Sequence, residues 1–253
     1  MQVAAFFPES LRAWNGRKSA VVYAAGCNFE CKYCYAHPIV KDSEKLELIP
    51  KEKIVEMLVK NYDEVNSVVL SGGEPLMQGK KLVEFLRELR AEGFSIKLDT
   101  NGSDSFLLEE LIAKGLLDFV SLDIKNQLND YAYFKITGKK LSVEQVLRSI
   151  QTIKYYGIEH EFRMTFVPEL HSHHDVLELS RQLKGSKCFV IQQFISSEGT
   201  LGKELEHSRN ANYEELLKIA RNVQGIDEVR IRTLKGDETI RPIAQSAWQR
   251  MLV

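Results

Sequence analysis

Short apolar runs rich in β-branched and aromatic residues alternate along this chain with amphipathic, helix-like segments. Three of the helix-like segments stop at a glycine, Gly93, Gly115 or Gly157, and glycine commonly ends a helix. Strands and helices that alternate over short connections predict a parallel sheet with helices packed outside it. About six such repeats predict an α/β fold of the open (β/α)6 partial-barrel type, not a closed eight-fold barrel. The predicted strands lie at 20–24, 67–70, 95–98, 119–122, 161–167, 188–194 and 228–233, and the predicted helices at 54–62, 80–92, 106–114, 143–156, 175–183 and 213–223.

The chain has 253 residues, of which 44% are apolar and 27% charged, as is ordinary for a globular protein with a sizeable core. No linker or low-complexity segment divides it, so we expect a single domain over 1–253. The core of that domain is expected at about 18–233, and the C-terminal segment 235–253 has no assigned role. Apolar residues at helical spacing between 243 and 252 predict a helix in that segment.

The formal net charge of −1 offers little electrostatic attraction for nucleic acid or an anionic membrane. No apolar run reaches the length that spans a bilayer, and the first residues lack the basic region of a secretory signal. Four cysteines are too few for a disulfide scaffold, and three of them lie within eight residues. We therefore expect a cytoplasmic protein that binds neither nucleic acid nor membrane.

Four polar motifs each follow the carboxyl end of a predicted strand. In parallel α/β folds that end of the sheet carries the active site, so we expect the four motifs to meet at one mouth. The motifs are the cysteine loop after 20–24, Gly-Gly-Glu-Pro at 72–75, Asp-Thr-Asn-Gly at 99–102 and Asp-Ile-Lys at 123–125.

Three cysteines, Cys27, Cys31 and Cys34, have spacings typical of ligands to one metal centre. Soft thiolates favour zinc, copper(I) or an iron–sulfur cluster, and three ligands leave a fourth position open. A structural zinc site needs four closed ligands, and no second Cys or His pair has that spacing here. Cys188 begins a strand, roughly 20 Å from its carboxyl end at about 3.3 Å per residue, so we expect it in the core. The spacing favours an iron–sulfur cluster over zinc or buried free thiols.

The remaining motifs carry groups that suit a charged ligand. The turn at 72–74 permits close backbone approach and offers acceptors for an ammonium group. Asp99 and Asp123 end neighbouring strands, where they could cap helices or together hold a cation or ligand polar groups. Lys125 and Arg163 are available for a ligand carboxylate.

Three closely spaced histidines, His171, His173 and His174, resemble a set of metal ligands. They lie just after Pro168 and before a predicted helix, so we expect them in a solvated loop instead.

Together these motifs resemble the radical S-adenosylmethionine (SAM) superfamily. Its three-cysteine motif, with an aromatic residue before the last cysteine, stands here as Cys27-x-x-x-Cys31-x-Tyr33-Cys34. Its methionine-binding turn stands at 72–75. Further segments are similar to the glycyl-radical-enzyme activating enzymes, most of all to the activating protein of anaerobic ribonucleotide reductase; they are 98–102, 122–125, 136–138, 161–168 and 192–194.

The resemblance implies that the three cysteines ligate three irons of a [4Fe–4S] cluster and that SAM chelates the fourth iron. A reduced flavodoxin or ferredoxin would supply one electron, and the resulting 5′-deoxyadenosyl radical would take a hydrogen atom from a glycine Cα of a partner enzyme. The turn at 72–74 would hold the SAM amino group, and Lys125 and Arg163 would lie near its carboxylate. Asp99 and Asp123 would help build the ribose side or hold a monovalent cation. The implied SAM-binding residues are Tyr33, Gly72, Gly73, Glu74, Asp99, Asn101, Ser121, Asp123, Lys125, Arg163 and Val167, with Val167 beside the adenine.

Two alternatives stay open at the level of sequence. A radical enzyme similar to 7-carboxy-7-deazaguanine synthase would act on a small molecule and would need extra polar groups to fix a heterocycle. A non-enzymatic iron–sulfur electron carrier would normally have four cysteine ligands, and a structural zinc protein would also need a fourth.

Overall fold

A single curved sheet organises the protein in the computed structural model, which describes residues 1–41, 43–140 and 142–241. The order of strands in the sheet follows the sequence from β1 to β9. Neighbouring strands from β2 to β8 pair in parallel, whereas β1 and β9 are antiparallel strands at the two edges. The strands are β1 (Val3–Trp14), β2 (Arg17–Ala24), β3 (Ser67–Gly72), β4 (Ser95–Thr100), β5 (Phe119–Asp123), β6 (Glu159–Phe166), β7 (Cys188–Gln193), β8 (Glu228–Thr233) and β9 (Gly236–Ile240).

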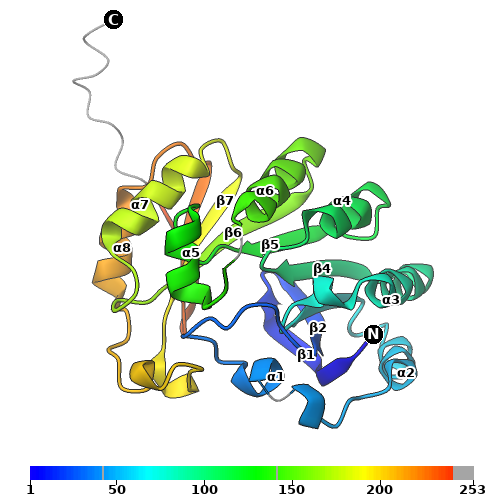
Figure 1. Ribbon diagram of the computed structural model, residues 1–253. Helices are drawn as coiled ribbons and strands as arrows, with labels where there is room; N and C mark the ends of the chain where they lie inside the picture. Colours follow the sequence, from blue (N-terminus) through cyan, green and yellow to red (C-terminus); the bar gives the residue numbers. More distant parts are fainter. Residues whose placement is uncertain (42, 141, 242–253) are drawn as a thin grey trace, which may run out of the picture.

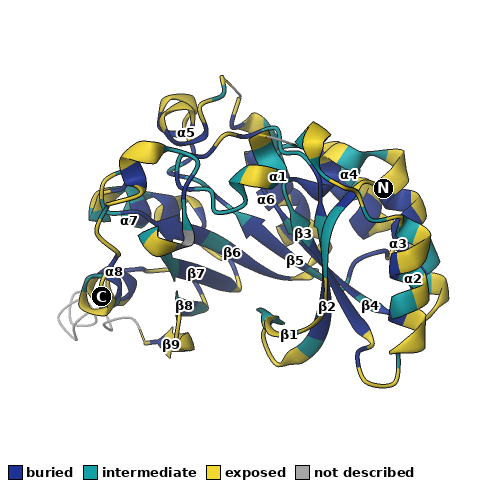
Figure 2. Cartoon of the chain, turned by 90° about the horizontal axis from the view of Figure 1, so that it is seen from below, coloured by how far each residue is buried: buried dark blue, intermediate teal, exposed yellow. Residues whose placement is uncertain are grey.

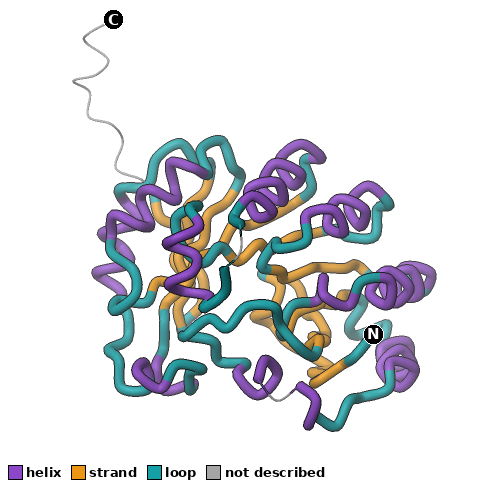
Figure 3. Tube along the Cα trace, viewed as in Figure 1, coloured by secondary structure: helices purple, strands orange, loops and turns teal. Residues whose placement is uncertain are grey.

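The helices lie along the outside of the curved sheet (Figures 1 and 3). They are α1 (His37–Lys41), α2 (Lys51–Lys60), α3 (Lys80–Ala91), α4 (Ser105–Ala113), α5 (Asp130–Thr137), α6 (Glu144–Tyr156), α7 (His173–Gln182) and α8 (Tyr213–Arg221). Short 3-10 turns, η1 (Ser43–Lys45), η2 (Pro75–Gln78), η3 (Ser196–Glu198) and η4 (Lys203–Leu205), lie in the connections. The predicted open, mainly parallel (β/α) barrel is confirmed, and Gly157 ends α6 as predicted.

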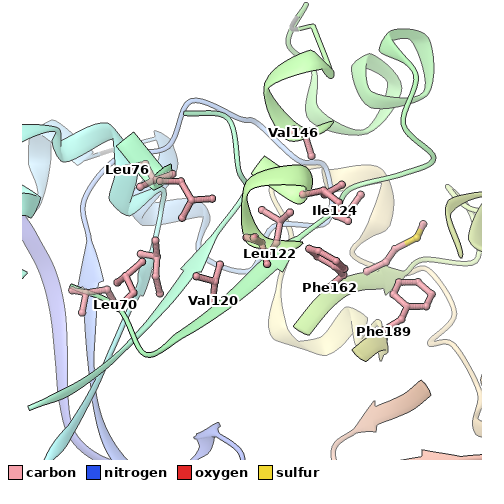
Figure 4. Close-up of a cluster of buried hydrophobic side chains, with 14 of the residues drawn as sticks. Leu70, Leu76, Val120, Leu122, Ile124, Val146, Phe162 and Phe189 are labelled. Carbon is pink, nitrogen blue, oxygen red and sulfur yellow. The ribbon is translucent and has the colours of Figure 1, made fainter. Parts of the chain in front are cut away.

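The core lies between the sheet and its helices. Leu122, Phe162 and Phe189 project from three successive strands, and Val146 of α6 packs in the same cluster (Figure 4). Leu122, Phe162 and Phe189 are fully buried. Burial of each such side chain stabilises the fold by about 1.5–3 kcal/mol. This rigid layer fixes where each strand ends, and therefore where each motif that follows a strand begins.

The two edge strands and α5 are not among the elements predicted from the sequence. β1 contains Pro8 and shifts register against β2 on both sides of Ser10, so its residues do not alternate regularly between apolar and polar. Four of the five residues of β9 are exposed, so that strand has no apolar pattern. Each of these edge strands forms because its backbone hydrogen-bonds to a hairpin partner. The side-chain pattern of the strand alone does not reveal that pairing. The helix predicted near 243–252 lies outside the described residues.

The sheet does not close into a full barrel. β1 and β9 are its two edges, and in the described residues no pairing joins them. Figure 2 shows both edge strands on the same side of the molecule. The sheet is therefore an open partial barrel with β1 and β9 at its edges.

Candidate active site

The four predicted motifs meet in one cavity of about 740 Å³ at the carboxyl ends of the parallel strands, which we call the main cavity. The expectation that separate strands bring these motifs together is therefore confirmed. The sequence-predicted residues in its wall are Cys27, Cys31, Tyr33, Cys34, Gly72, Gly73, Glu74, Asp99, Asn101, Asp123, Lys125 and Arg163.

The three clustered cysteines are all free thiols, and the connection between β2 and α1 carries them into the wall of the main cavity. Burial raises the pKa of Cys27 to about 11 and that of Cys31 to about 12, and it also raises the pKa of Cys34. Without a metal these thiols are protonated at neutral pH, and metal binding must displace the protons. One buried thiol, Cys31, and two partly buried thiols, Cys27 and Cys34, offer soft donor atoms at the same cavity. Cys188 lies apart, buried at the start of β7, as predicted.

The Gly-Gly-Glu turn after β3 is pressed against the backbone that leads into the cysteine loop. The amide of Gly73 donates to the carbonyl of Ala24 at 3.0 Å, and that of Glu74 donates to Gly26 at 2.8 Å. A Cβ on Gly73 would lie 1.8 Å from the Gly26 oxygen, and Gly72 has a φ of +115°. Only glycine fits this approach. The distance between the turn and the thiols is thus set by backbone contacts.

The buried Glu74 carboxylate links two turns through hydrogen bonds. It accepts hydrogen bonds from the Thr100 hydroxyl at 2.6 Å, the Asn101 amide at 2.7 Å and the Leu76 amide at 3.1 Å. Burial raises the pKa of Glu74 to about 7, although these donors oppose the shift. Both carboxylate oxygens therefore already have partners, so the backbone carbonyls of the turn are the more available acceptors for a ligand.

Asn101 connects the turn after β4 with the cysteine loop. Its side-chain amide donates to Asn28 Oδ1 at 2.9 Å, and Asn28 in turn donates to the Ser103 hydroxyl at 2.7 Å. The backbone of Asn101 meanwhile binds Glu74. The cysteine loop, the glycine turn and the turn after β4 therefore form one hydrogen-bonded unit.

Ion pairs between largely buried side chains lie at the main cavity. Lys125 Nζ lies 3.0 Å from Asp123, and Lys97 Nζ lies 3.2 Å from Asp99. The Arg163 guanidinium reaches both carboxylates, at 3.3 Å from Asp123 and 3.9 Å from Asp99. Burial would raise the pKa of Asp123, but Lys125 and Arg163 outweigh it and the pKa is lowered. Both carboxylates are thus neutralised by side chains of this protein, and the monovalent cation stays a prediction.

Lys97 is a member of this network that the sequence reasoning missed. Its side chain is only 3% exposed, and its ammonium also donates to the Ala13 carbonyl of β1 at 2.6 Å. A lysine inside a strand two residues before Asp99 points to the same face as that aspartate, which is the signal that could have found it.

Four buried polar atoms at the main cavity lack hydrogen-bond partners in the described part of the chain, namely Arg163 Nε, Tyr33 Oη, Asp99 Oδ1 and Asp123 Oδ1. Lys125 Nζ lies 5.9 Å from the Tyr33 ring centre. Buried donors without partners carry a cost that a polar ligand can remove. Cations, a hydroxyl and open backbone carbonyls beside three thiols fit a ligand that bears both an amino and a carboxylate group.

Ser121 and Val167 lie behind the wall of the main cavity. The Ser121 hydroxyl donates to Glu161 at 2.7 Å, and Glu161 also receives two hydrogen bonds from Arg232 at 2.9 Å. Val167 is fully buried in the core. Neither residue is among those lining this cavity, so their roles in ligand binding stay predictions.

His171 links the turns after β5 and β6, and the expectation of a solvated position is wrong for it. It is 3% exposed; its Nδ1 accepts from the Val167 amide at 3.0 Å, and its Nε2 lies 3.0 Å from the Lys125 carbonyl. Because Nδ1 accepts, Nε2 carries the proton and donates. Burial lowers the pKa of His171 to about 4, so the ring is neutral. His174 is exposed, and His173 is partly exposed beside Glu215.

A second cavity of about 380 Å³ adjoins the main one and shares Tyr35 and Gln192 with it. Its buried cation, Arg232, is neutralised by Glu161 and Asp237. The sequence reasoning missed this second cavity because half of its residues come from the edge strands β1 and β9 and their hairpin connections, which were not predicted. They are Leu11, Arg12, Asn15, Tyr35, Gln192, Gln193, Ile195, Arg232, Thr233, Leu234, Gly236 and Asp237.

None of the helices in residues 1–41, 43–140 and 142–241 is both long enough and apolar enough to cross a bilayer.

Comparison with known proteins places these features in a family. Residues 21–181 match the Radical SAM superfamily. A candidate glycyl-radical enzyme activating enzyme of Methanocaldococcus jannaschii is 30% identical over 87% of this chain and 91% of its own length. The pyruvate formate-lyase-activating enzyme of Clostridium pasteurianum is 27% identical over 85% of this chain and 87% of its own. The crystal structure of Streptococcus suis SuiB bound to S-adenosylmethionine shares the fold, with a TM-score of 0.61 and 15% identity, over 84% of this chain and about half (49%) of SuiB.

Proposed function

The chain belongs to the radical SAM superfamily, and we propose that it activates a glycyl-radical enzyme by taking a hydrogen atom from a glycine Cα of that partner. The observation that carries this proposal is the second cavity, which adjoins the main cavity and is lined in part by the edge strands β1 and β9. A substrate atom placed there would face the residues that hold the cofactors. A cavity lined in part by strand edges suits a loop of another protein.

In this proposal Cys27, Cys31 and Cys34 hold the [4Fe–4S] cluster that the family implies, and the main cavity holds SAM beside it. Bound there, the cluster and SAM supply a 5′-deoxyadenosyl radical. The carbonyls of the turn at 72–74 bind the SAM amino group, and Arg163 Nε and Lys125 bind its carboxylate. The buried walls exclude water, which would otherwise quench a reactive intermediate.

The remaining predicted residues form the rest of the SAM pocket in the proposal. Asp99 and Asp123 border the ribose, and Tyr33 and Asn101 close the side next to the cysteine loop. Ser121 and Val167 act from behind the wall, where Ser121 orients Glu161 and Val167 supports the adenine side. The protein orients the cofactors and contributes no general base.

The lining of the second cavity suits a peptide. Asn15 and Gln192 present side-chain amides that can bond a peptide backbone, whereas the Gln193 amide nitrogen already donates to the Ala211 carbonyl at 2.6 Å. The partly buried guanidinium of Arg232 binds two carboxylates of the protein itself, so Arg12 is the cation of this lining that can meet an acidic group of a substrate. Leu234 is 56% exposed at the mouth of the cavity and offers an apolar contact.

We further propose a protein substrate, an electron donor and a cellular compartment for the reaction. The segments that resemble the activating protein of anaerobic ribonucleotide reductase favour that reductase as the substrate. A reduced flavodoxin or ferredoxin would supply the electron. We propose that the chain acts as one domain over 1–253, in the cytoplasm.

Electron paramagnetic resonance under anaerobic conditions tests the proposal. Reconstituted protein, SAM and dithionite would be mixed with anaerobic ribonucleotide reductase or with pyruvate formate-lyase, each from the same source, with Cys31→Ala as the control. A glycyl-radical doublet in the reductase sample that is absent from the control supports the proposal in full. A doublet only with pyruvate formate-lyase overturns the choice of partner. SAM cleavage without a doublet in either sample overturns the activating function.

A further inference from the structure

The buried thiol Cys31 is held from both sides by the end of α5. The amide of Glu30, the residue before Cys31, donates to the Thr137 carbonyl at 2.9 Å. The amide of Lys32, the residue after it, donates to the Ile136 carbonyl at 3.2 Å. The last turn of α5 is therefore hydrogen-bonded to the backbone on both sides of this thiol.

α5 is firmly anchored on its inner side. Tyr133 is 1% exposed, and its hydroxyl accepts a hydrogen bond from the Lys125 amide at 3.2 Å. Ala132 and Ile136 are also buried. Because the inner side is fixed in this way, the outer side of the helix presents a defined surface.

The outer side of α5 carries two exposed aromatic residues one turn apart and one lysine, and two more lysines follow the end of the helix. Tyr131 is 68% exposed and Phe134 is 42% exposed. Lys135, which lies 4.6 Å from the Tyr131 ring, is exposed, as is Lys140. We define Tyr131, Phe134, Lys135, Gly138, Lys139 and Lys140 as the α5 surface; the helix projects from the molecule with exposed residues outward (Figure 2).

The charge of this surface is positive although the chain as a whole has a net charge of −1. Lys139 pairs with Glu30 at 2.6 Å. The exposed Asp130 accepts from the Val143 amide at 2.8 Å. The charges of Lys135 and Lys140 remain for a partner, because no carboxylate in the described residues forms an ion pair with either. Exposed aromatics beside cations are typical of protein interfaces, and the charge selects an acidic partner.

We propose that the α5 surface docks the electron donor, a small acidic protein that carries a flavin or an iron–sulfur cluster. This inference rests on the one-electron requirement of the proposed radical chemistry and does not depend on which substrate is activated. The donor loses one electron and the metal centre held by the three cysteines gains it, with no proton transferred. A donor seated at Gly138 contacts the cysteine loop directly, since a Cβ built there would lie 3.7 Å from the Glu30 carbonyl.

Stopped-flow reduction of the cluster in the holoenzyme tests the docking surface. Reduced flavodoxin and reduced ferredoxin serve as acidic donors, and dithionite serves as a small reductant that needs no docking. The variants are Lys135→Glu and Phe134→Ser, with Tyr155→Ser on α6 as a matched control because Tyr155 is 85% exposed. Fluorescence titration with oxidised flavodoxin and ferredoxin measures docking apart from electron transfer.

We expect Lys135→Glu to slow reduction by at least one acidic donor about tenfold or more at low salt, and to weaken its binding similarly. Phe134→Ser should weaken binding without changing the salt dependence, and Tyr155→Ser should change neither rate nor affinity. Reduction by dithionite should be the same in all proteins. The docking site would be overturned if each protein donor reduced Lys135→Glu as fast as the wild type. It would also be overturned if reduction by dithionite slowed as much as reduction by the protein donors. Dithionite-driven formation of the glycyl radical tests the proposed function separately, because it bypasses the donor.

Discussion

The main cavity and the second cavity share Tyr35 and Gln192, yet they are built in different ways. The main cavity consists largely of turns that follow parallel strands, held together by backbone contacts such as those of Gly73. The second cavity consists mostly of residues on or beside edge strands, including Leu11 of β1 and Asp237 of β9. The shape of the main cavity therefore depends on close backbone packing between turns. The character of the second cavity depends on which side chains the edge strands present.

This difference separates the chemistry from the choice of substrate. Cofactor binding needs fixed distances between sulfur, carbonyl and cationic groups, and neighbouring strand ends supply fixed distances. Substrate recognition needs an accessible surface, and the exposed residues at the edges of an open barrel, such as Leu11, supply it. Changes in the main cavity should abolish all activity, whereas changes at the mouth of the second should affect only the protein substrate.

The largest effect should follow removal of a thiol from the main cavity. Cys31→Ala deletes one of the three proposed iron ligands, so iron content and SAM cleavage should both be lost. The loss of activity should exceed the roughly 10–100-fold that loss of a supporting group costs at a metal site. Iron analysis and the visible absorbance of the reconstituted protein measure the first effect, and product chromatography measures the second. Cys188→Ala is the control, because Cys188 is buried at the start of β7 and should leave iron content unchanged. Full iron content in Cys31→Ala would contradict the assignment.

The next effect should come from the close backbone approach that defines the main cavity. In Gly73→Ala the new Cβ would lie 1.8 Å from a backbone oxygen of Gly26, so the turn must move. We expect a loss of about 1–3 kcal/mol in the free energy of unfolding and the loss of SAM binding. Gly115→Ala is a matched control, because a Cβ at this position would meet no atom within 4 Å. Its φ of +63° means that alanine adds backbone strain of about 1–2 kcal/mol but no steric clash. Equilibrium dialysis with SAM distinguishes them, and normal SAM binding by Gly73→Ala would show that backbone fit does not define the cavity.

The contrast between the cavities also explains how far the sequence could predict this protein. Strands such as β3 are buried on both faces and therefore contain a continuous apolar run, here at 68–70. Each cofactor motif is also contiguous in the sequence, as in Gly72 and Gly73. The local sequence pattern was enough to predict these strands and motifs. The strands β1 and β9 are irregular or polar, and their pairing is decided by partners distant in sequence or by a hairpin.

Individual side chains at the site were harder to predict for a related reason. Glu74 looks like a free carboxylate in the sequence, but Thr100 and Asn101 already use both oxygens. His171 looks like a loop residue, but the fold buries it between two backbone groups. In each case the partner lies on another turn, and sequence spacing does not show which turns meet.

A smaller effect should follow loss of the link that His171 makes behind the main cavity. His171→Leu leaves the Val167 amide and the Lys125 carbonyl without partners, which costs about 1–3 kcal/mol for each buried group. We expect lower stability and weaker SAM binding. His171→Gln can restore both hydrogen bonds and should recover much of the loss, and His174→Gln on the exposed neighbour should have no effect. Chemical denaturation and SAM titration measure these changes; equal stability of all three variants would contradict the link.

The same residue gives a pH dependence with a defined sign. The folded-state pKa of His171 is about 4, below its ordinary value of 6.5, because burial disfavours the charged ring. The unfolded chain therefore binds more protons between these values, and the contribution of His171 to stability is lost as the pH falls from 6.5 toward 4. The loss should approach roughly 3 kcal/mol. Denaturation midpoints across this range should fall less steeply for His171→Gln than for the wild type, and parallel curves would contradict the buried neutral ring.

The smallest and most selective effect should appear at the mouth of the second cavity. Leu11 is 72% exposed and Leu234 is 56% exposed, so each can be changed to glutamate without disturbing the core. If a protein loop covers them, losing a buried leucine contact costs about 1.5–3 kcal/mol, which is a factor of about ten or more in binding. Glycyl-radical formation at low partner concentration should fall by that factor in Leu11→Glu and Leu234→Glu, while dithionite-driven SAM cleavage without the partner stays at the wild-type rate. Val59→Glu on α2, where Val59 is 42% exposed, should change neither. A parallel fall in SAM cleavage would mean that the two cavities are not separate in function, because the edges would then shape the cofactor site as well.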